Sequence, residues 1–248
     1  MEKIYLSEDE RLDDLQLDGL KIIQKVGGYA FTSDSVLLAN FVKAKKTDIC
    51  LEIGTGSGII SILVNYKQTP KKIYAFELQD KQSQLAIKNM QICKMQDKID
   101  VINDKIQNYS NYLKAGSVDV IFSNPPYFKF DSKVCGNVNE KVLSRFDIEL
   151  PLDQMFIAVS KLLKFGGKFY FIYDSSRFDE CIIEMKKYNL TPKKVFFIHP
   201  NENKNSTTFL CEATLGGKQQ LKIMPPIFTN NLDGEYVQTL QKLFKNKQ

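Results

Sequence analysis

The chain has 248 residues, with 34 Lys and Arg, 29 Asp and Glu, and a formal net charge of +5. This length suits one α/β domain with small additions, and no apolar run approaches the roughly 20 residues of a membrane-spanning helix. The polar start of the chain lacks the apolar stretch of a signal peptide, so we expect a cytoplasmic protein without a membrane segment. Five scattered cysteines, with no C-x-x-C pair, predict reduced thiols and neither a metal site nor a disulfide framework. The mild basic excess is compatible with a polyanionic partner but does not require one.

The predicted elements begin with a polar lead-in and then alternate between strands and helices. Residues 1–30 are expected to form a hairpin or a strand and 31–248 an α/β core, so that 1–248 is one domain. Ser33-Asp34-Ser35 predict the N-cap of a helix that follows them, and Gly166-Gly167 predict the C-cap of a later helix. The strands are predicted at 48–53, 72–76, 99–102, 118–122, 168–173, 194–199 and 207–215, and the helices at 36–42, 59–66, 80–94, 152–163 and 178–188. This alternation predicts a doubly wound, mainly parallel sheet whose last two strands pair antiparallel with each other. Ligands bind such sheets beyond the carboxyl ends of the strands.

A glycine-rich loop joins the first predicted core strand to a helix. In the run Glu52-Ile53-Gly54-Thr55-Gly56-Ser57-Gly58, the glycines allow a sharp turn and a close approach to a ligand. The pattern is G-x-G-x-G, and Ile59 stands where a dinucleotide-binding fingerprint needs its third glycine. A pyrophosphate is therefore disfavoured at this loop. Glycine-rich turns also occur without ligands, so the loop alone does not establish a site.

Acidic residues follow the next two strands. Glu77 ends the second core strand, where a carboxylate can accept hydrogen bonds from the hydroxyl groups of a ribose. Asp104 ends the third and can bind an adenine amino group. Each acid alone is more commonly a surface residue. Three successive strands that end in a glycine loop, an acid and an acid predict a site for an adenosine-containing ligand without a phosphate.

The fourth core strand ends in Ser123-Asn124-Pro125-Pro126-Tyr127. Two prolines stiffen this backbone, and the residue before a proline is extended, so the Asn124 side chain and the Ser123 and Pro125 carbonyls are held at the strand end. These acceptors can bind both hydrogens of an NH₂ group, which leaves the nitrogen lone pair available to attack a methyl sulfonium in line. Tyr127 can stack on a flipped base, with Phe128 or Phe130 beside it. The alternative interpretation is a Pro-Pro turn that only ends a strand.

These residues resemble the Rossmann-like amino-group methyltransferases, which use S-adenosyl-L-methionine. The resemblance is closer still to the bacterial tRNA1(Val) adenine-N6 methyltransferases, and it covers essentially the whole chain. The segments that carry this closer resemblance are Phe31 to Ala39, Asn124 to Phe128, Phe197 to Lys204, Leu221 to Pro226 and Asp233 to Tyr236.

The resemblance implies an α/β, Rossmann-like class I methyltransferase fold, with a mainly parallel seven-stranded sheet and an antiparallel last strand. It implies that Asp34 and the 54–58 loop hold the methionine end of the cofactor, Glu77 its ribose and Asp104 its adenine. The partner is then a tRNA, the target is the adenine just 3′ of the anticodon in a valine tRNA, and we expect a monomer. The catalytic candidates are Asn124, Pro125, Pro126 and Tyr127, and the cofactor-binding candidates are Asp34, Glu52, Gly54, Gly56, Gly58, Glu77, Asp104 and Asn124.

The chain departs from that family's pattern at one point. The family often has an Arg-His pair after the catalytic loop, whereas Arg145 is followed here by Phe146, so Arg145 is only a weak candidate for an RNA contact. His199 is the only histidine, and its place at a predicted strand end favours a structural role over a role near RNA.

Other functions share parts of these motifs. An enzyme that methylates a glutamine side-chain amide in release factors meets the same chemical problem, but such enzymes carry a helical domain before the core, and fewer than 50 residues precede the first core strand here. A ribosomal RNA guanine-N2 methyltransferase remains an alternative. A nicotinamide-dependent oxidoreductase is disfavoured by Ile59, and a non-catalytic RNA-binding protein by Asn124 and Tyr127.

Overall fold

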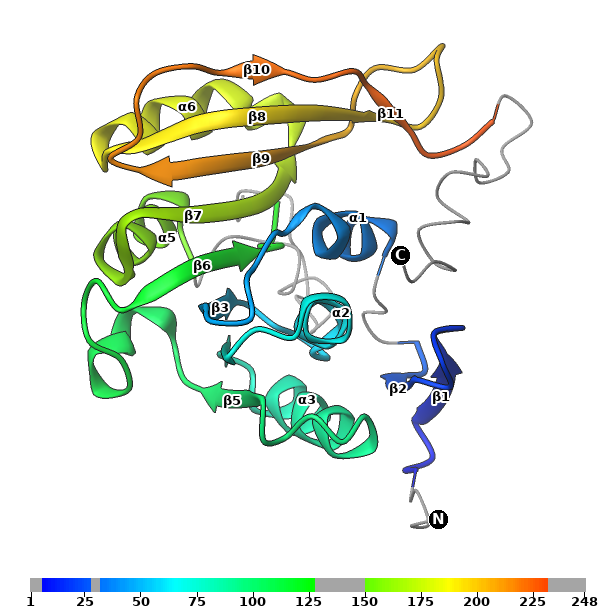
Figure 1. Cartoon of the computed structure of the whole chain (residues 1–248). Helices are drawn as coiled ribbons and strands as arrows, with labels where there is room; N and C mark the ends of the chain where they lie inside the picture. Colours follow the sequence, from blue (N-terminus) through cyan, green and yellow to red (C-terminus); the bar gives the residue numbers. More distant parts are fainter. Residues whose placement is uncertain (1–5, 28–31, 128–149, 232–248) are drawn as a thin grey trace, which may run out of the picture.

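The computed structural model describes residues 6–27, 32–127 and 150–231 (Figure 1). Its elements in chain order are β1 (Glu10–Asp14), β2 (Lys21–Lys25), α1 (Ser33–Phe41), β3 (Ile49–Ile53), α2 (Ile59–Gln68), β4 (Lys72–Glu77), α3 (Asp80–Ile92), β5 (Ile99–Asn103), η1 (Ile106–Asn111), β6 (Val118–Ser123), α5 (Leu152–Leu162), β7 (Leu163–Asp174), η2 (Ser175–Arg177), α6 (Phe178–Lys187), β8 (Leu190–His199), β9 (Thr208–Leu215), β10 (Lys222–Ile223) and β11 (Ile227–Phe228). The predicted roles of Phe128, Phe130 and Arg145 fall outside the described residues. Among the residues described, no helix is long and apolar enough to cross a membrane.

The main sheet has the order β5-β4-β3-β6-β7-β9-β8-β10, and β11 also pairs with β8. β9 runs antiparallel to both β7 and β8, and the other paired strands of this sheet are parallel. The seven longer strands therefore confirm the predicted mainly parallel sheet with its last strand antiparallel. The two-residue strands β10 and β11 were not predicted, because they are too short to show a period-2 pattern. They cover the outer edge of β8, which would otherwise offer unpaired backbone groups.

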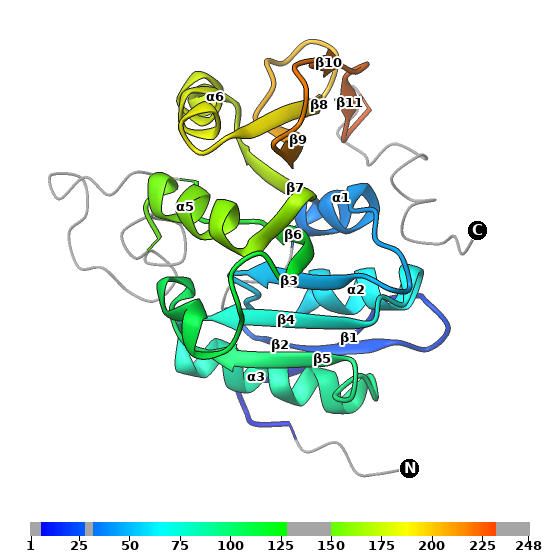
Figure 2. The same ribbon diagram turned by 60° about the vertical axis from the view of Figure 1, so that its left-hand side comes forward.

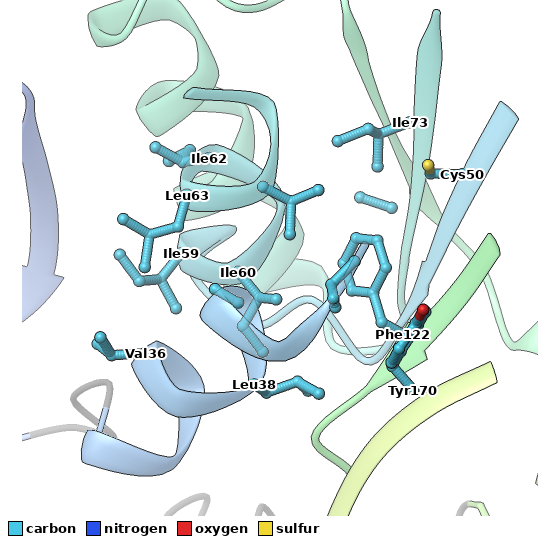
Figure 3. Close-up of a cluster of buried hydrophobic side chains, with 14 of the residues drawn as sticks. Val36, Leu38, Cys50, Ile59, Ile60, Ile62, Leu63, Ile73, Phe122 and Tyr170 are labelled. Carbon is cyan, nitrogen blue, oxygen red and sulfur yellow. The ribbon is translucent and has the colours of Figure 1, made fainter. Parts of the chain in front are cut away.

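Helices cover both faces of this sheet (Figures 1 and 2). One face packs against α1, α2 and α3, and the opposite face against α5, α6 and η1. Figure 3 shows the first face, where Leu38 and Ile60 from the helices approach Phe122 and Tyr170 of the sheet; all four are nearly inaccessible to solvent. Strands buried on both faces have near-continuous apolar runs, which explains the lack of simple alternation in Val118–Ser123.

Two predicted helix caps are wrong. Helix α1 begins at Ser33, with Thr32 at the N-cap position and no side-chain capping bond, so Ser33-Asp34-Ser35 form its first turn instead of preceding it. Helix α5 ends at Leu162, and the chain continues directly into β7. Gly166, with φ +79°, lies inside β7, at the irregularity where the pairing of β7 with β6 shifts register. The glycines therefore allow a bulge in the strand, and tertiary pairing overrides the local cap signal.

The lead-in forms an antiparallel hairpin of β1 and β2, which confirms the first of its two predicted forms. The hairpin is fixed to α3 through Asn89, whose side chain is fully buried. The Asn89 Oδ1 accepts from the Ile23 N–H at 2.7 Å, and its Nδ2 donates to the carbonyls of Ile23 at 3.0 Å and of Ser57 at 2.9 Å. One amide side chain thus joins the hairpin, α3 and the glycine loop.

Replacing Asn89 should destabilise the fold strongly. Asn89→Ala removes the partner of three backbone groups, of which the two of Ile23 are buried and the Ser57 carbonyl is partly buried, so we expect the free energy of unfolding to fall by about 2–4 kcal/mol. Urea denaturation measures this change, with the exposed Asn111→Ala as a matched control that should lie within about 0.5 kcal/mol of wild type. A similar stability for both variants would contradict the bridging role of Asn89.

Candidate active site

The carboxyl ends of the central parallel strands meet at one edge of the sheet. Ile53 of β3 lies opposite Phe76 of β4 and Ser123 of β6, and Glu77 lies opposite Asn103 of β5. The glycine loop, Glu77, Asp104 and the Asn-Pro-Pro-Tyr segment follow these positions directly in the sequence. The structure therefore brings the sequence-predicted site residues to a common edge.

Glu77 organises the glycine loop. Its Oε2 accepts from the Gly56 N–H at 2.8 Å and its Oε1 from the Gln79 N–H at 2.9 Å. Gly56 has φ +55°, which lies in the left-handed region of backbone conformation that favours glycine. Burial raises the pKa of Glu77, while the backbone bonds from Gln79 and Gly56 oppose that rise. Each oxygen keeps lone pairs for a further donor, such as a ribose hydroxyl.

Glu52 lies beneath the loop and is completely buried. Its Oε2 accepts from the Thr55 hydroxyl at 2.7 Å and from the Ser61 backbone N–H at 3.1 Å. Burial raises the pKa of Glu52 to about 8, although the bonds from Ser61 and Thr55 lower it. Its Oε1 is inaccessible to solvent and has no hydrogen-bond partner within the described residues. Such an unsatisfied carboxyl oxygen fits a ligand that brings a positive charge or a donor to this loop.

Gly58 differs from the other loop glycines. It has φ +88°, and a Cβ there would meet the flexible end of the Met90 side chain of α3. Among the described residues, and apart from each glycine and its chain neighbours, no atom lies within 4 Å of a Cβ built at Gly54 or Gly56. Gly58 therefore faces α3 and needs glycine for its backbone conformation, whereas Gly54 and Gly56 leave open space beside the backbone, as a bound ligand requires.

Helix α1 fixes the orientation of the Asn124 amide. The Asn124 Nδ2 donates to the Ser35 hydroxyl at 3.2 Å. The Tyr127 hydroxyl lies 2.6 Å from the Asn124 Oδ1 and 3.1 Å from the Asp34 Oδ2, so its single proton can be donated to either oxygen or shared between them. The Ser123 hydroxyl donates to the Ile53 carbonyl at 2.8 Å, which ties the end of β6 to the start of the glycine loop. With its NH₂ held by Ser35, Asn124 keeps Oδ1 as an acceptor with a second lone pair.

Asp34 is mostly buried beside this segment. Burial raises the pKa of its carboxyl group, and the bond from the Tyr127 hydroxyl lowers it. Asp34, Glu52 and Glu77 thus form a group of desolvated carboxyl groups around the strand ends. Such a group favours a cationic ligand, because a positive charge would stabilise their ionised forms.

Asp104 is at the expected edge but already has several partners. Its carboxylate accepts hydrogen bonds from the Asn108 Nδ2 at 2.8 Å, the Lys105 N–H at 2.8 Å and the Tyr112 hydroxyl at 3.1 Å. These bonds lower the pKa of Asp104, and the bond from Asn108 has the largest effect. A carboxylate offers about four acceptor positions, so one remains for a ligand amino group.

Several residues near the site were not identified from the sequence. Ser35 is inside the first helical turn, and its bond to Asn124 joins residues 89 positions apart, which no local pattern reveals. Leu78 and Tyr112 expose 38% and 47% of their surface beside Glu77 and Asp104, so they can offer apolar contacts to a ligand ring. The position of Leu78 directly after Glu77 was an available signal, whereas Tyr112 had none.

His199 ends β8, and its Nδ1 lies 2.9 Å from the Lys204 carbonyl. This bond closes the loop between β8 and β9, which agrees with the structural role favoured by its position. In the described part of the chain, no three His, Cys, Asp or Glu side chains are grouped as a metal site.

The fold and the site define an S-adenosyl-L-methionine-dependent methyltransferase. The model of the methyltransferase small domain family matches residues 31–176, more than half of the chain. The chain therefore belongs to the methyltransferase small domain family.

Two relatives and one solved structure are similar to this chain. A Pedobacter heparinus protein named tRNA1(Val) (adenine(37)-N6)-methyltransferase is 28% identical over 172 residues, 69% of this chain and 71% of the relative. A Bacteroides fragilis protein of the same name is 24% identical over 230 residues, 90% of this chain and 92% of the relative. The crystal structure of a predicted O-methyltransferase from Agrobacterium tumefaciens has a TM-score of 0.70 at 15% identity, covering 87% of this chain and 98% of that one. The last similarity concerns the fold alone.

Removing the Glu77 carboxylate should weaken cofactor binding. Each hydrogen bond to a charged group contributes about 1.5–3 kcal/mol, so Glu77→Ala should raise the Kd for S-adenosylhomocysteine by roughly 10- to 100-fold. Isothermal titration calorimetry measures this Kd, with the exposed Glu8→Ala as the control. An unaltered Kd for Glu77→Ala would refute its role in binding the ribose.

The raised pKa of Glu52 predicts a pH-dependent stability of the cofactor-free protein. The ordinary pKa of Glu52 is 4.5 and its folded-state pKa is about 8, so between these values the folded chain binds more protons than the unfolded chain. Stability from this group is therefore complete below pH 4.5 and is lost as pH rises to 8. Glu52→Gln removes this loss and should become more stable relative to wild type by up to about 1.4 kcal/mol per pH unit.

Urea denaturation of both proteins at pH 5, 6, 7 and 8 tests this prediction. The difference between variant and wild type should rise through the series. A constant difference would show that Glu52 is ionised in the folded protein throughout this range.

Proposed function

We propose that this protein transfers the methyl group of S-adenosyl-L-methionine to the N6 nitrogen of an adenine in tRNA, next to the anticodon of a valine tRNA. The observation that carries the proposal is the fixed Asn124 amide: its Nδ2 donates to Ser35, and its Oδ1 accepts from the Tyr127 hydroxyl and keeps a second lone pair for an amino group. The names of the Pedobacter and Bacteroides relatives support the choice of tRNA and adenine.

The cofactor supplies an electrophilic methyl group on a sulfonium. We assign its methionine end to Asp34, Glu52 and the loop of Gly54 to Gly58. Glu77 would hold the ribose, and Asp104 with Tyr112 the adenine. The desolvated carboxyl groups of Asp34, Glu52 and Glu77 suit a ligand with positive charges on its ammonium and sulfonium groups.

The acceptor nitrogen is activated by orientation. The Asn124 Oδ1 and the carbonyls of Ser123 and Pro125 accept the two amino hydrogens, which keeps the lone pair from delocalising into the base and directs it at the methyl group. Tyr127 stacks on the extruded base, and its hydroxyl bonds to Asn124 and Asp34 fix its ring. The proton leaves the nitrogen after transfer, so no strong general base is needed.

The domain organisation, oligomeric state and location of the enzyme are also proposals. We propose one methyltransferase domain over the chain, acting as a cytoplasmic monomer without a metal. The alternatives are methylation of a release-factor glutamine amide and of the N2 nitrogen of a ribosomal RNA guanine, since each acceptor is also an NH₂ group. The tRNA assignment is favoured over them by relatives that share most of this chain.

Transfer to unmodified tRNA tests this function. With labelled S-adenosyl-L-methionine and total unmodified tRNA, we expect N6-methyladenosine in a single tRNA species, detected by nucleoside mass spectrometry. Asn124→Ala is the matched control and should reduce transfer by at least about 100-fold while leaving the Kd for S-adenosylhomocysteine within about threefold, because it removes only the acceptor's partner.

The competing substrates are assayed in parallel. If release factor or ribosomal RNA becomes labelled while tRNA does not, the proposed tRNA substrate is wrong and the labelled molecule is the substrate. Full activity of Asn124→Ala would contradict the mechanism whichever substrate is modified.

A further inference from the structure

A charged side chain from a distant element holds the far end of the Asn-Pro-Pro-Tyr segment. Arg177 ends η2, just after β7, and only 11% of its side chain is exposed. Its Nη1 donates to the backbone carbonyl of Tyr127 at 3.1 Å and to the Tyr173 hydroxyl at 2.6 Å. One guanidinium nitrogen therefore fixes the main chain of Tyr127 and the ring beside it.

The orientation of Arg177 is itself set by an ion pair. Its Nε lies 2.9 Å from the Glu180 Oε2 and its Nη2 lies 3.0 Å from the Glu180 Oε1. This bidentate arrangement leaves Nη1 directed at Tyr127 and Tyr173. A planar fork with donors on three nitrogens can make these contacts together, whereas a lysine ammonium is a single point donor. The contacts use the positive charge internally, which disfavours a role in binding a phosphate.

The contact reaches Asn124 through the Tyr127 side chain. The Tyr127 ring packs edge-on against Tyr173, with ring centroids 5.7 Å apart and an interplanar angle of 76°. At the other end of that ring, the hydroxyl donates to the Asn124 Oδ1 at 2.6 Å. Movement of the Tyr127 backbone therefore shifts the bond that helps to orient the Asn124 amide.

We infer that Arg177, held by Glu180, is a positioning residue for methyl transfer: it fixes Tyr127, and through it Asn124, in the geometry that the acceptor nitrogen requires. The effect on turnover rests on the proposed function, whereas the effect on Tyr127 does not. Small misplacements of reacting groups lower rates strongly, and a shift of about 1 Å can reduce turnover about 100-fold.

The kinetic test compares Arg177→Ala and Arg177→Lys with the control Arg11→Ala. This control removes another guanidinium–carboxylate contact, that of the exposed Arg11 with Asp13 on β1. For methylation of tRNA we expect kcat to fall about 10- to 100-fold for Arg177→Ala, with the KM for tRNA and the Kd for S-adenosylhomocysteine each within about threefold of wild type. Arg177→Lys should lose less kcat than Arg177→Ala. Added guanidinium ion at millimolar concentration should restore part of the kcat of Arg177→Ala, but none of the kcat of Asn124→Ala. Unchanged kcat, or a loss matched by weaker S-adenosylhomocysteine binding, would overturn the inference.

A second measurement needs no substrate and so separates failure of this inference from failure of the proposed function. In protein labelled with 3-fluorotyrosine, the fluorine resonance of Tyr127 is assigned by its disappearance in Tyr127→Phe. This resonance should shift and broaden in Arg177→Ala and stay unchanged in Arg11→Ala. An unperturbed Tyr127 signal in folded Arg177→Ala would refute the positioning role even if tRNA proved to be the wrong substrate.

Discussion

The parallel register of β3 with its two neighbours is the constraint on which the site depends. Ile53 lies opposite Phe76 on one side and Ser123 on the other, so the glycine loop, Glu77 and Asn124 emerge at the same level of the sheet. The Ser123 hydroxyl and the Ile53 carbonyl fix this level by a side-chain bond as well. A shift of one residue in either pairing would point each side chain to the opposite face. The chemistry of the edge is therefore set by pairing in the core of the sheet.

The same edge concentrates buried carboxyl groups, which a stable fold would otherwise avoid. Desolvation raises the pKa of Asp34, Glu52 and Glu77, so each carboxyl group is harder to ionise in the folded protein than in water. Glu52 is the most desolvated of the three. One of its carboxyl oxygens accepts from Thr55 and Ser61, and the other has no hydrogen-bond partner among the described residues. At the proposed site, a cationic methyl donor would offset this desolvation by supplying positive charge. Binding energy is thus available because the protein maintains these groups in an unfavourable state.

The sequence predicted the long elements and the residue types at the strand ends, because both leave local patterns. Apolar runs, helical spacing and the Asn-Pro-Pro-Tyr segment are contiguous features. The errors have a common physical reason. The polar residues of Ser33–Ser35 looked like a helix cap, yet Asp34 and Ser35 bind Tyr127 and Asn124, which are about 90 positions away. Asn89 and Arg177 could not be found for the same reason, since their partners are remote in the sequence. Local propensity is weak where tertiary contacts use the same side chains.

The Asn-Pro-Pro-Tyr segment illustrates why a short motif is insufficient on its own. Its prolines fix backbone angles, but they do not determine which way the Asn124 amide faces or where Tyr127 lies. Ser35 of α1 determines the first, and Arg177 after β7 bears on the second. These two partners come from α1 and from the turn after β7, so the proposed acceptor site forms only when α1, β6 and β7 have come together. Because the two contacts hold opposite ends of the segment, Asn124 is fixed against both rotation of its amide and displacement of its backbone. The amino nitrogen of the proposed acceptor would need both restraints, since its hydrogens and its lone pair must be oriented at the same time.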